Sequence, residues 1–166
     1  MNGDTTFVRL SEAASAPYRP AGRFAWHFAR GKLRADPVFR YLVQERMIPE
    51  GARILDLGCG QGLLAGLLAE AGGPRIASYR GIEMMVRDVA RAHRALGGGC
   101  GVELGDIRNI GFGAADVVVI LDVLHYLRPS EQDDVLHRAR QALQGGGRLL
   151  LRVGDAAGGL PFRFSN

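Results

Sequence analysis

Short hydrophobic runs typical of buried strands alternate along this chain with segments whose hydrophobic residues recur at helical spacing. Short, mostly apolar runs that end in glycine or charged residues predict buried β-strands. Such runs lie at 54–57, 76–83, 100–104, 115–121 and 148–153. The run at 115–121 is the strongest, because it is apolar on both faces, as a central parallel strand requires.

Between these runs, apolar residues recur every three or four positions, which is the period of a helix with one buried face. Helices are therefore predicted at 63–71, at 84–96 and from Pro129 onward. Glycine-rich triplets are predicted to end them, at 72–74, 97–99 and 145–147. Strands that alternate with helices form a parallel sheet. Right-handed crossovers, with a switch point between the first and fourth strands, then bring the strand tips to one edge.

The residues before the first strand have a different pattern. Residues 1–20 contain turn formers and a kink at Pro17–Pro20, so they are predicted to form a loop or at most a short helix. A helix is predicted at Arg23–Leu33. Asp36–Pro37 supplies the cap and first-turn proline of a second helix, whose apolar face reaches Met47.

Length, composition and charge indicate how many domains the chain has and which kinds of partner it is expected to bind. The 166 residues suit a single domain, and the 24 glycines suit a fold with many strand–helix turns. The net charge of +4 comes from arginines spread along the chain, without a basic cluster interleaved with aromatic residues, which disfavours nucleic acid. No apolar run approaches the ~20 residues of a membrane span, and no signal peptide pattern begins the chain. A cytoplasmic protein that does not contact membrane is therefore expected.

The cysteines and the acidic residues give no sign of a metal. Cys59 and Cys100 have neither a disulfide framework nor metal-ligand spacing. Cys59 lies inside a glycine-rich turn and is interpreted as a small residue tolerated beside a ligand. No metal site is predicted.

The stretch Arg53–Gly62 carries the strongest functional signal. An apolar strand leads directly into Gly58, Gly60 and Gly62, and a leucine-rich helix follows. Glycine lets the backbone adopt positive φ and approach a ligand closely, and the free N–H groups at a helix start form an electropositive rim. This arrangement predicts a cradle for a small molecule.

Two kinds of nucleotide ligand fit this turn poorly. A dinucleotide fingerprint would need its third glycine where Leu63 stands, and no Gly-Lys-Ser/Thr follows for a P-loop. Asp56, at the strand exit, would repel a pyrophosphate but attract a cationic amino group, directly or through water. A cofactor with a cationic amino-acid end and no phosphates remains, and S-adenosylmethionine is such a cofactor.

Residues Leu55–Gly62, Leu-Asp-Leu-Gly-Cys-Gly-Gln-Gly, resemble the first motif of the class I (Rossmann-like) S-adenosylmethionine-dependent methyltransferases. The resemblance covers about residues 50–155. It implies an α/β, three-layer sandwich with a mostly parallel sheet of order 3-2-1-4-5. Residues 1–50 would then form an N-terminal helical lid and residues 51–166 the cofactor-binding part of one domain. The C-terminal strands of the full family fold would be missing, so the fifth strand would be an edge.

The resemblance also implies roles for particular residues. Glu83, at the tip of the second strand, would accept the ribose hydroxyls, as acids do in dinucleotide folds. Asp106 would accept the adenine amino group while Ile107 packs on the ring. Asp122 could face either the methionine end of the cofactor or the substrate. The predicted cofactor-binding set is Asp56, Gly58, Cys59, Gly60, Glu83, Met84, Asp106, Ile107 and Asp122.

The sequence says less about the residues that would bind the methyl acceptor than about those that would bind the cofactor. His125 follows the fourth strand, and histidine is the commonest general base in enzymes, so it is the candidate general base, although it could equally be a packing residue. Candidate substrate-side residues are Tyr18, Trp26, His27 and Tyr126. The expected activity is methyl transfer to a small molecule, phenolic or polyketide-like. The alternatives are RNA or protein methylation, or a non-catalytic cofactor-binding subunit. The edge of the fifth strand predicts a homodimer or a partner subunit.

Overall fold

The computed structural model describes residues 3–71 and 76–154. A five-stranded parallel sheet of order β3-β2-β1-β4-β5 forms its centre. The strands are β1 (Arg53–Leu57), β2 (Ser78–Glu83), β3 (Val102–Leu104), β4 (Ala115–Leu121) and β5 (Leu143–Arg152). The predicted α/β, Rossmann-like fold and its strand order are confirmed.

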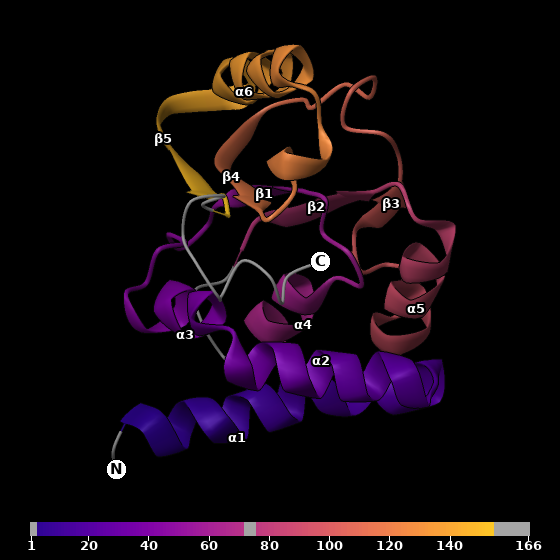
Figure 1. The fold of residues 1–166 in the computed structure, drawn as a ribbon. Helices are drawn as coiled ribbons and strands as arrows, with labels where there is room; N and C mark the ends of the chain where they lie inside the picture. The colour runs from indigo at the N-terminus through magenta and orange to yellow at the C-terminus, as the bar shows by residue number, and fades with distance from the viewer. Residues whose placement is uncertain (1–2, 72–75, 155–166) are drawn as a thin grey trace.

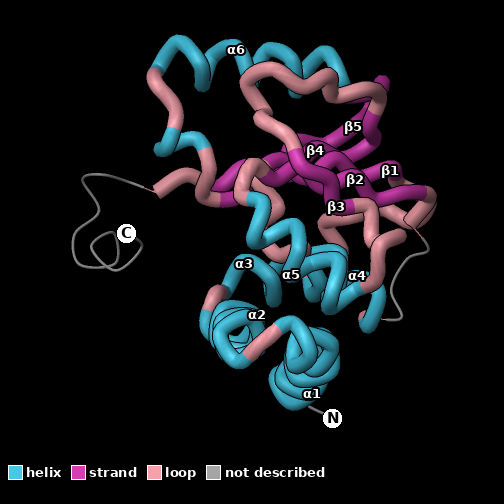
Figure 2. Tube along the Cα trace, turned by 90° about the vertical axis from the view of Figure 1, so that its right-hand side faces the viewer, coloured by secondary structure: helices cyan, strands magenta, loops and turns pink. Residues whose placement is uncertain are grey.

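Helices cover both faces of this sheet (Figure 1). They are α1 (Gly3–Ser15), α2 (Arg23–Ala35), α3 (Pro37–Gln44), α4 (Leu63–Glu70), α5 (Val86–Leu96) and α6 (Pro129–Ala142), with 3-10 turns η1 (Ala16–Ala21) and η2 (Leu124–Tyr126). In Figure 2, α6 lies on one side of the sheet, and α4 and α5 lie on the other with α1 and α2 outside them. The N-terminal helices therefore form an extra outer layer.

The hydrophobic core is divided by the sheet. On one face, Leu55 and Leu57 of β1 pack with Val135 and Ala139 of α6. On the other face, β1 and β4 pack against α4 and against buried residues of α1, α2 and α3. The N-terminal helices thus share a core with the sheet.

The N-terminus differs from the sequence-based expectation. Residues 1–20 were expected to be loop or short helix, but α1 is a 13-residue helix followed by η1. Phe7 and Ala14 of α1 are buried. Their seven-residue spacing places them on one helical face against the core, so packing decides the conformation of this segment.

The fifth strand also begins earlier than expected. The glycine triplet 145–147 does not end α6 but lies within β5, where the register shifts between Ala115 and Val117 of the neighbouring strand. Glycines are suited to such a bulge because they tolerate an irregular backbone without a side chain to place. The predicted helix stop at 72–74 and the chain after Gly154 lie outside the described residues.

No helix in the described part of the chain is long and apolar enough to cross a membrane. The cytoplasmic location stays a prediction.

Tyr18 is the largest correction to the site predicted from sequence. It was expected on the substrate side, but its side chain is fully buried and its hydroxyl donates to the Gln61 carbonyl at 2.8 Å. We expect Tyr18→Ala to lower the free energy of unfolding by about 3–5 kcal/mol, as for other large-to-small aromatic substitutions in cores. Urea denaturation measures this. Tyr41→Ala, at an exposed position of α3, is the control and should change stability little. Equal effects would contradict the core position of Tyr18.

Candidate functional site

The glycine turn after β1 is the centre of the candidate site. Gly58, Gly60 and Gly62 all have positive φ, at 74°, 56° and 73°. The backbone N–H groups of Gly58 and Cys59 both donate to the Ile82 carbonyl, at 2.8 and 3.2 Å. A Cβ on Gly58 would lie 2.3 Å from Val123 Cγ2, so a side chain cannot fit there. The turn therefore packs closely against the end of β2 and the residues that follow β4.

Glu83 fixes this turn from the tip of β2. Its buried carboxylate accepts the backbone N–H of Gly60 through Oε2 at 2.9 Å and that of Met85 through Oε1 at 2.8 Å. A carboxylate oxygen can accept more than one hydrogen bond, so Glu83 retains capacity for a ligand. It links the glycine turn to the start of α5.

Asp56 precedes the turn on the last part of β1 and is buried. Burial raises the pKa of its carboxyl to about 7; the hydrogen bond from Tyr79 opposes this shift, and the charge of Glu83 adds to it. The carboxylate lies at the wall of a cavity. It therefore changes charge close to neutral pH.

Two cavities adjoin the glycine turn. The first, about 210 Å³, is lined by Phe28, Lys32, Phe39, Asp56, Gly58–Leu64 except Gly62, Leu121, Asp122 and Arg152. The second, about 540 Å³, is bounded by the ends of β2, β3 and β4 and includes Glu83, Met84, Asp106, Ile107 and Tyr126. Gly58, Leu121 and Asp122 line both. A ligand longer than either cavity could therefore pass over Gly58.

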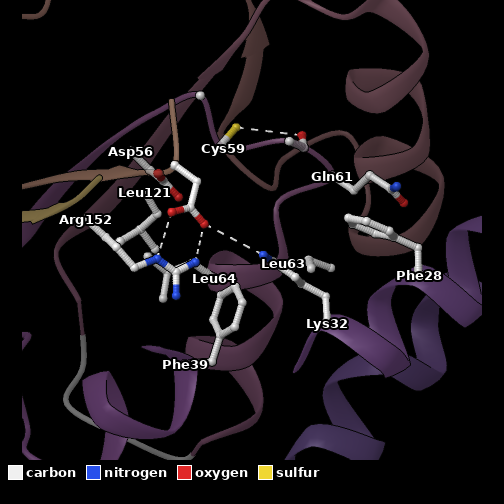
Figure 3. A pocket seen from close by; sticks show the side chains of 13 residues that line it. Phe28, Lys32, Phe39, Asp56, Cys59, Gln61, Leu63, Leu64, Leu121 and Arg152 are labelled. Carbon is white, nitrogen blue, oxygen red and sulfur yellow. Dashed lines mark hydrogen bonds and ion pairs between the residues drawn. The ribbon is translucent and has the colours of Figure 1, made fainter. Parts of the chain in front are cut away.

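Two cations and two carboxylates form a cluster beside the first cavity. The Arg152 guanidinium bonds Asp36 through Nη2 at 2.7 Å and Asp122 through Nε at 2.9 Å. Lys32 Nζ lies 2.7 Å from Asp36 Oδ2 and 3.8 Å from Asp122 Oδ2. Figure 3 shows Lys32 and Arg152 approaching this cavity from opposite sides. The cluster joins the N-terminal helices to the tips of β4 and β5.

This cluster lowers the pKa of Asp36 and so keeps that acid charged. Burial alone would raise the pKa of Asp36, but hydrogen bonds from Arg152 and Lys32 lower it far below its usual range. Hydrogen bonding to Asp36, partly opposed by burial, raises the pKa of Arg152. Asp122 has a left-handed backbone with φ of 55°, which is uncommon outside glycine and is tolerated best by Asp and Asn. Such backbone strain is often found at functional sites.

The predicted adenine-side residues lie together at the second cavity. Met84 and Ile107 line it, from the ends of β2 and β3. Asp106 also lines it, and its carboxylate is engaged by Arg108 at 2.6 Å and by the Arg108 backbone N–H at 2.9 Å. The Arg108 hydrogen bond lowers the pKa of Asp106. The structure thus brings these residues to one place.

The predicted acceptor-side residues are divided. Tyr126 lines the second cavity. Trp26 and His27 lie side by side on α2 with tilted rings, whose centroids are 4.6 Å apart, and they line neither of the two cavities. His125 is exposed beside Tyr126 and likewise lines neither. Its role as a general base stays a prediction.

Cys59 lies in the first cavity as a packing residue. Its thiol fills the space over Gly81, where a Cβ would lie 2.6 Å from the sulfur. Burial, aided by the charges of Asp56 and Glu83, raises the pKa of the thiol. A protonated thiol is a poor nucleophile, so Cys59 is a packing residue in the cavity wall, and its contact with a ligand stays a prediction.

Sequence reasoning missed several residues that line the first cavity, among them Phe28, Lys32, Phe39 and Arg152. Their positions on the predicted helices and strand were visible, but nothing local distinguishes them from surface charges or packing aromatics. Only one signal was available: Arg152 lies at the carboxyl end of a predicted strand, where ligands bind in this class of sheet.

The fold and this turn define a class I, Rossmann-like S-adenosylmethionine-binding protein. A methyltransferase-domain family model matches residues 54–147, and the chain belongs to this family. It is 33% identical over 115 residues to a carboxy-S-adenosyl-L-methionine synthase of Chromohalobacter salexigens, covering 66% of this chain and 43% of the relative. It is 31% identical over 121 residues to a ubiquinone biosynthesis O-methyltransferase of Xanthomonas axonopodis pv. citri, covering 70% and 48%.

Solved structures agree with this assignment. An S-adenosylmethionine-dependent methyltransferase from Mesorhizobium loti matches with a TM-score of 0.55 and 26% identity, over 69% of this chain and 52% of that protein. The chain spans less than half the length of the two sequence relatives, at 43% and 48%. The cofactor of the family is S-adenosylmethionine. The residues present fit it, because the site combines a turn open to close approach with groups of both charges.

Proposed function

We propose that this chain is an S-adenosylmethionine-dependent methyltransferase that acts on a small, phenolic acceptor. The observation that carries the proposal is the pair of cavities that meet at Gly58, one edged by Glu83 and Asp106 and the other by mixed charges. The names of the two relatives describe different activities, so the acceptor class is inferred from the residues of this site.

The adenosine end of the cofactor would occupy the second cavity. Glu83 would accept hydrogen bonds from the ribose, with its position already fixed by two backbone N–H groups. Asp106 would accept the adenine amino group, and Met84 and Ile107 would contact the ring. Asp106 would then share its carboxylate between Arg108 and the ligand.

The amino-acid end would occupy the first cavity, where its charges have partners of opposite sign. This end is a zwitterion, and the cavity is lined by two cations, Lys32 and Arg152, and two acids, Asp56 and Asp122. An ammonium group would face Asp56 or Asp122, and a carboxylate would face Lys32 or Arg152. A ligand with only one sign of charge would gain less, because it would also face like charges.

The cofactor supplies an electrophilic methyl group, and the chain mainly has to hold an acceptor in line with it. Orientation alone can contribute roughly 7–11 kcal/mol in well-arranged systems. Phe28 and Tyr126 border the two cavities and are 43% and 73% exposed, which leaves aromatic surface for an acceptor beside the bound cofactor. A phenol must lose a proton, and we propose His125, next to Tyr126, as the base.

Lys32→Met tests the placement of the amino-acid end. We expect the affinity for S-adenosylhomocysteine to fall by about 1–2 kcal/mol, the lower part of the range for a charged hydrogen bond at a part-exposed site. Affinity for 5′-methylthioadenosine, which lacks the amino-acid end, should not change. Calorimetry measures both. The control is Arg34→Met, an exposed residue of the same helix that lines neither cavity. Equal losses for the two ligands would contradict this placement.

Methyl transfer itself is tested with isotope-labelled cofactor and a panel of acceptors. Phenols should become labelled, and RNA, protein and aliphatic amines should not. Glu83→Ala should lower the labelling rate at limiting cofactor, because it removes both the ribose acceptor and the anchor of the glycine turn. Labelling of RNA or protein in place of phenols, or binding without any transfer, would contradict the proposal and favour the alternative functions.

We also propose that a second copy of the chain covers the outer part of β5. Leu149, Leu151 and Val153 alternate along the strand and are 39%, 43% and 54% exposed. Leu149 and Leu151 pair in register with Val118 and Ile120, whose side chains are in the core on the α6 face. An apolar stripe at the edge of a sheet favours association.

Sedimentation tests this association. The chain should sediment as a dimer, and Leu151→Asp should make it a monomer, because a buried carboxylate at the interface would be unpaired. Leu104→Asp, at an exposed apolar position on the opposite edge strand, is the control and should leave the dimer intact. A monomeric parent chain would contradict the proposal.

A further inference from the structure

A partly buried tyrosine contacts the acid at the centre of the site. The Tyr79 hydroxyl donates to Asp56 Oδ2 at 2.6 Å, which is a short hydrogen bond to a carboxylate. The register explains the contact. Asp56 pairs with Gly81, and Tyr79 lies two residues earlier on β2, so both side chains project from the same face of the sheet.

Glycine makes this contact possible. A Cβ on Gly81 would lie 3.0 Å from Tyr79 Cε1, so the absence of a side chain leaves room for the ring to lie along β2 toward Asp56. Burial, followed by the charge of Asp56, raises the pKa of Tyr79 well above its usual value. The phenol therefore keeps its proton and acts as a donor.

Tyr79 has no other evident role in the site. It lines neither cavity, whereas Asp56 lines the first. Its hydroxyl donates to one Asp56 oxygen, and the other Asp56 oxygen is not bonded to Tyr79. A carboxylate held in this way has a fixed orientation and can accept from an ammonium group in the cavity.

We propose that Tyr79 is a positioning residue, whose hydroxyl keeps the Asp56 carboxylate ionised and oriented for the ammonium group of the cofactor. This inference rests on the proposed placement of the amino-acid end. A hydrogen bond to the charged form of an acid favours that form. Without it, Asp56 would be a buried acid beside Glu83, and both burial and that neighbouring charge favour protonation.

Several titratable or charged groups share this environment, and they come from every element around Asp56. They are Lys32 on α2, Cys59 in the glycine turn, Tyr79 and Glu83 on β2, Asp122 after β4, Arg152 on β5 and, beyond Tyr79, Tyr18 in η1. The ordinary pKa values of Cys59, Tyr18 and Tyr79 already lie above the neutral range, and burial raises them further. The pKa of Asp56, at about 7, lies within it.

The proposal predicts a particular pH dependence. Ammonium binding needs ionised Asp56, so affinity for the zwitterionic cofactor should rise as the pH rises through about 7. Loss of the Tyr79 hydroxyl should raise the Asp56 pKa further. The rise in affinity would then occur at a higher pH, and a ligand without an ammonium group would show no such shift.

The experiment compares Tyr79→Phe with the parent chain by calorimetry between pH 6 and 8.5. The ligands are S-adenosylhomocysteine and 5′-methylthioadenosine. Tyr79→Phe should bind S-adenosylhomocysteine about fivefold or more weakly at pH 7, with the difference shrinking toward pH 8.5, as for a shift of about one pH unit. Its affinity for 5′-methylthioadenosine should equal that of the parent. Tyr41→Phe, on the exposed face of α3, is the matched control and should change neither profile.

A second variant separates positioning from folding. Asp56→Asn should bind S-adenosylhomocysteine without the rise near pH 7, and adding Tyr79→Phe to it should have no further effect on the pH profile. If the melting temperature shows that Tyr79→Phe folds poorly, Asp56→Asn alone still tests the inference, because a rise in affinity near pH 7 that persists in Asp56→Asn would overturn it.

Three results would overturn the inference alone: a Tyr79→Phe profile equal to that of the parent, an equal weakening of both ligands, or the same loss at every pH. If the parent chain binds neither ligand, the proposed function fails and this inference fails with it.

Discussion

The shape of the site depends on the ion pairs that the Arg152 guanidinium makes with two carboxylates. The guanidinium bonds Asp36, which caps α3 through the Val38 N–H, and Asp122, which ends β4 in a left-handed conformation. Because Asp36 is nearly inaccessible to solvent, loss of its cationic partners would leave an uncompensated buried charge, which is strongly destabilising. The first cavity therefore keeps its wall of Phe28, Lys32 and Phe39 only while the N-terminal helices remain joined to the sheet edge.

The glycine turn forms the opposite wall, and it is held by a different kind of interaction. Backbone N–H groups of the turn donate to the Ile82 carbonyl and to the Glu83 carboxylate. No charge pair is needed there, so Glu83 keeps capacity for a ligand. One wall is thus fixed by side-chain ion pairs between distant segments, and the other by backbone hydrogen bonds to the neighbouring strand.

The charged groups in the two walls of the site are compensated to different extents. Lys32 and Arg152 are paired with acids, whereas within residues 3–71 and 76–154 the buried Asp56 carboxylate is bonded by a neutral donor alone, Tyr79. A carboxylate in that position is unfavourable in the free protein and becomes favourable when a cation arrives. This difference gives a physical reason for the site to select a ligand with an ammonium group.

The sequence by itself determined the features that depend on local chemistry. Gly58, Asp56 and Glu83 could be placed at strand ends because turns and strand ends are short-range patterns, and the alternation of strands and helices brings the strand tips to one edge. The tertiary structure decided which distant residues meet. Arg152 and its partner Asp36 are 116 positions apart in the sequence, and Tyr18 and its hydrogen-bond partner Gln61 are 43 positions apart. Nothing near Lys32, Tyr18 or the 145–147 glycines distinguishes a cavity wall, a core residue or a bulge from ordinary surface, because those states are set by what packs against them.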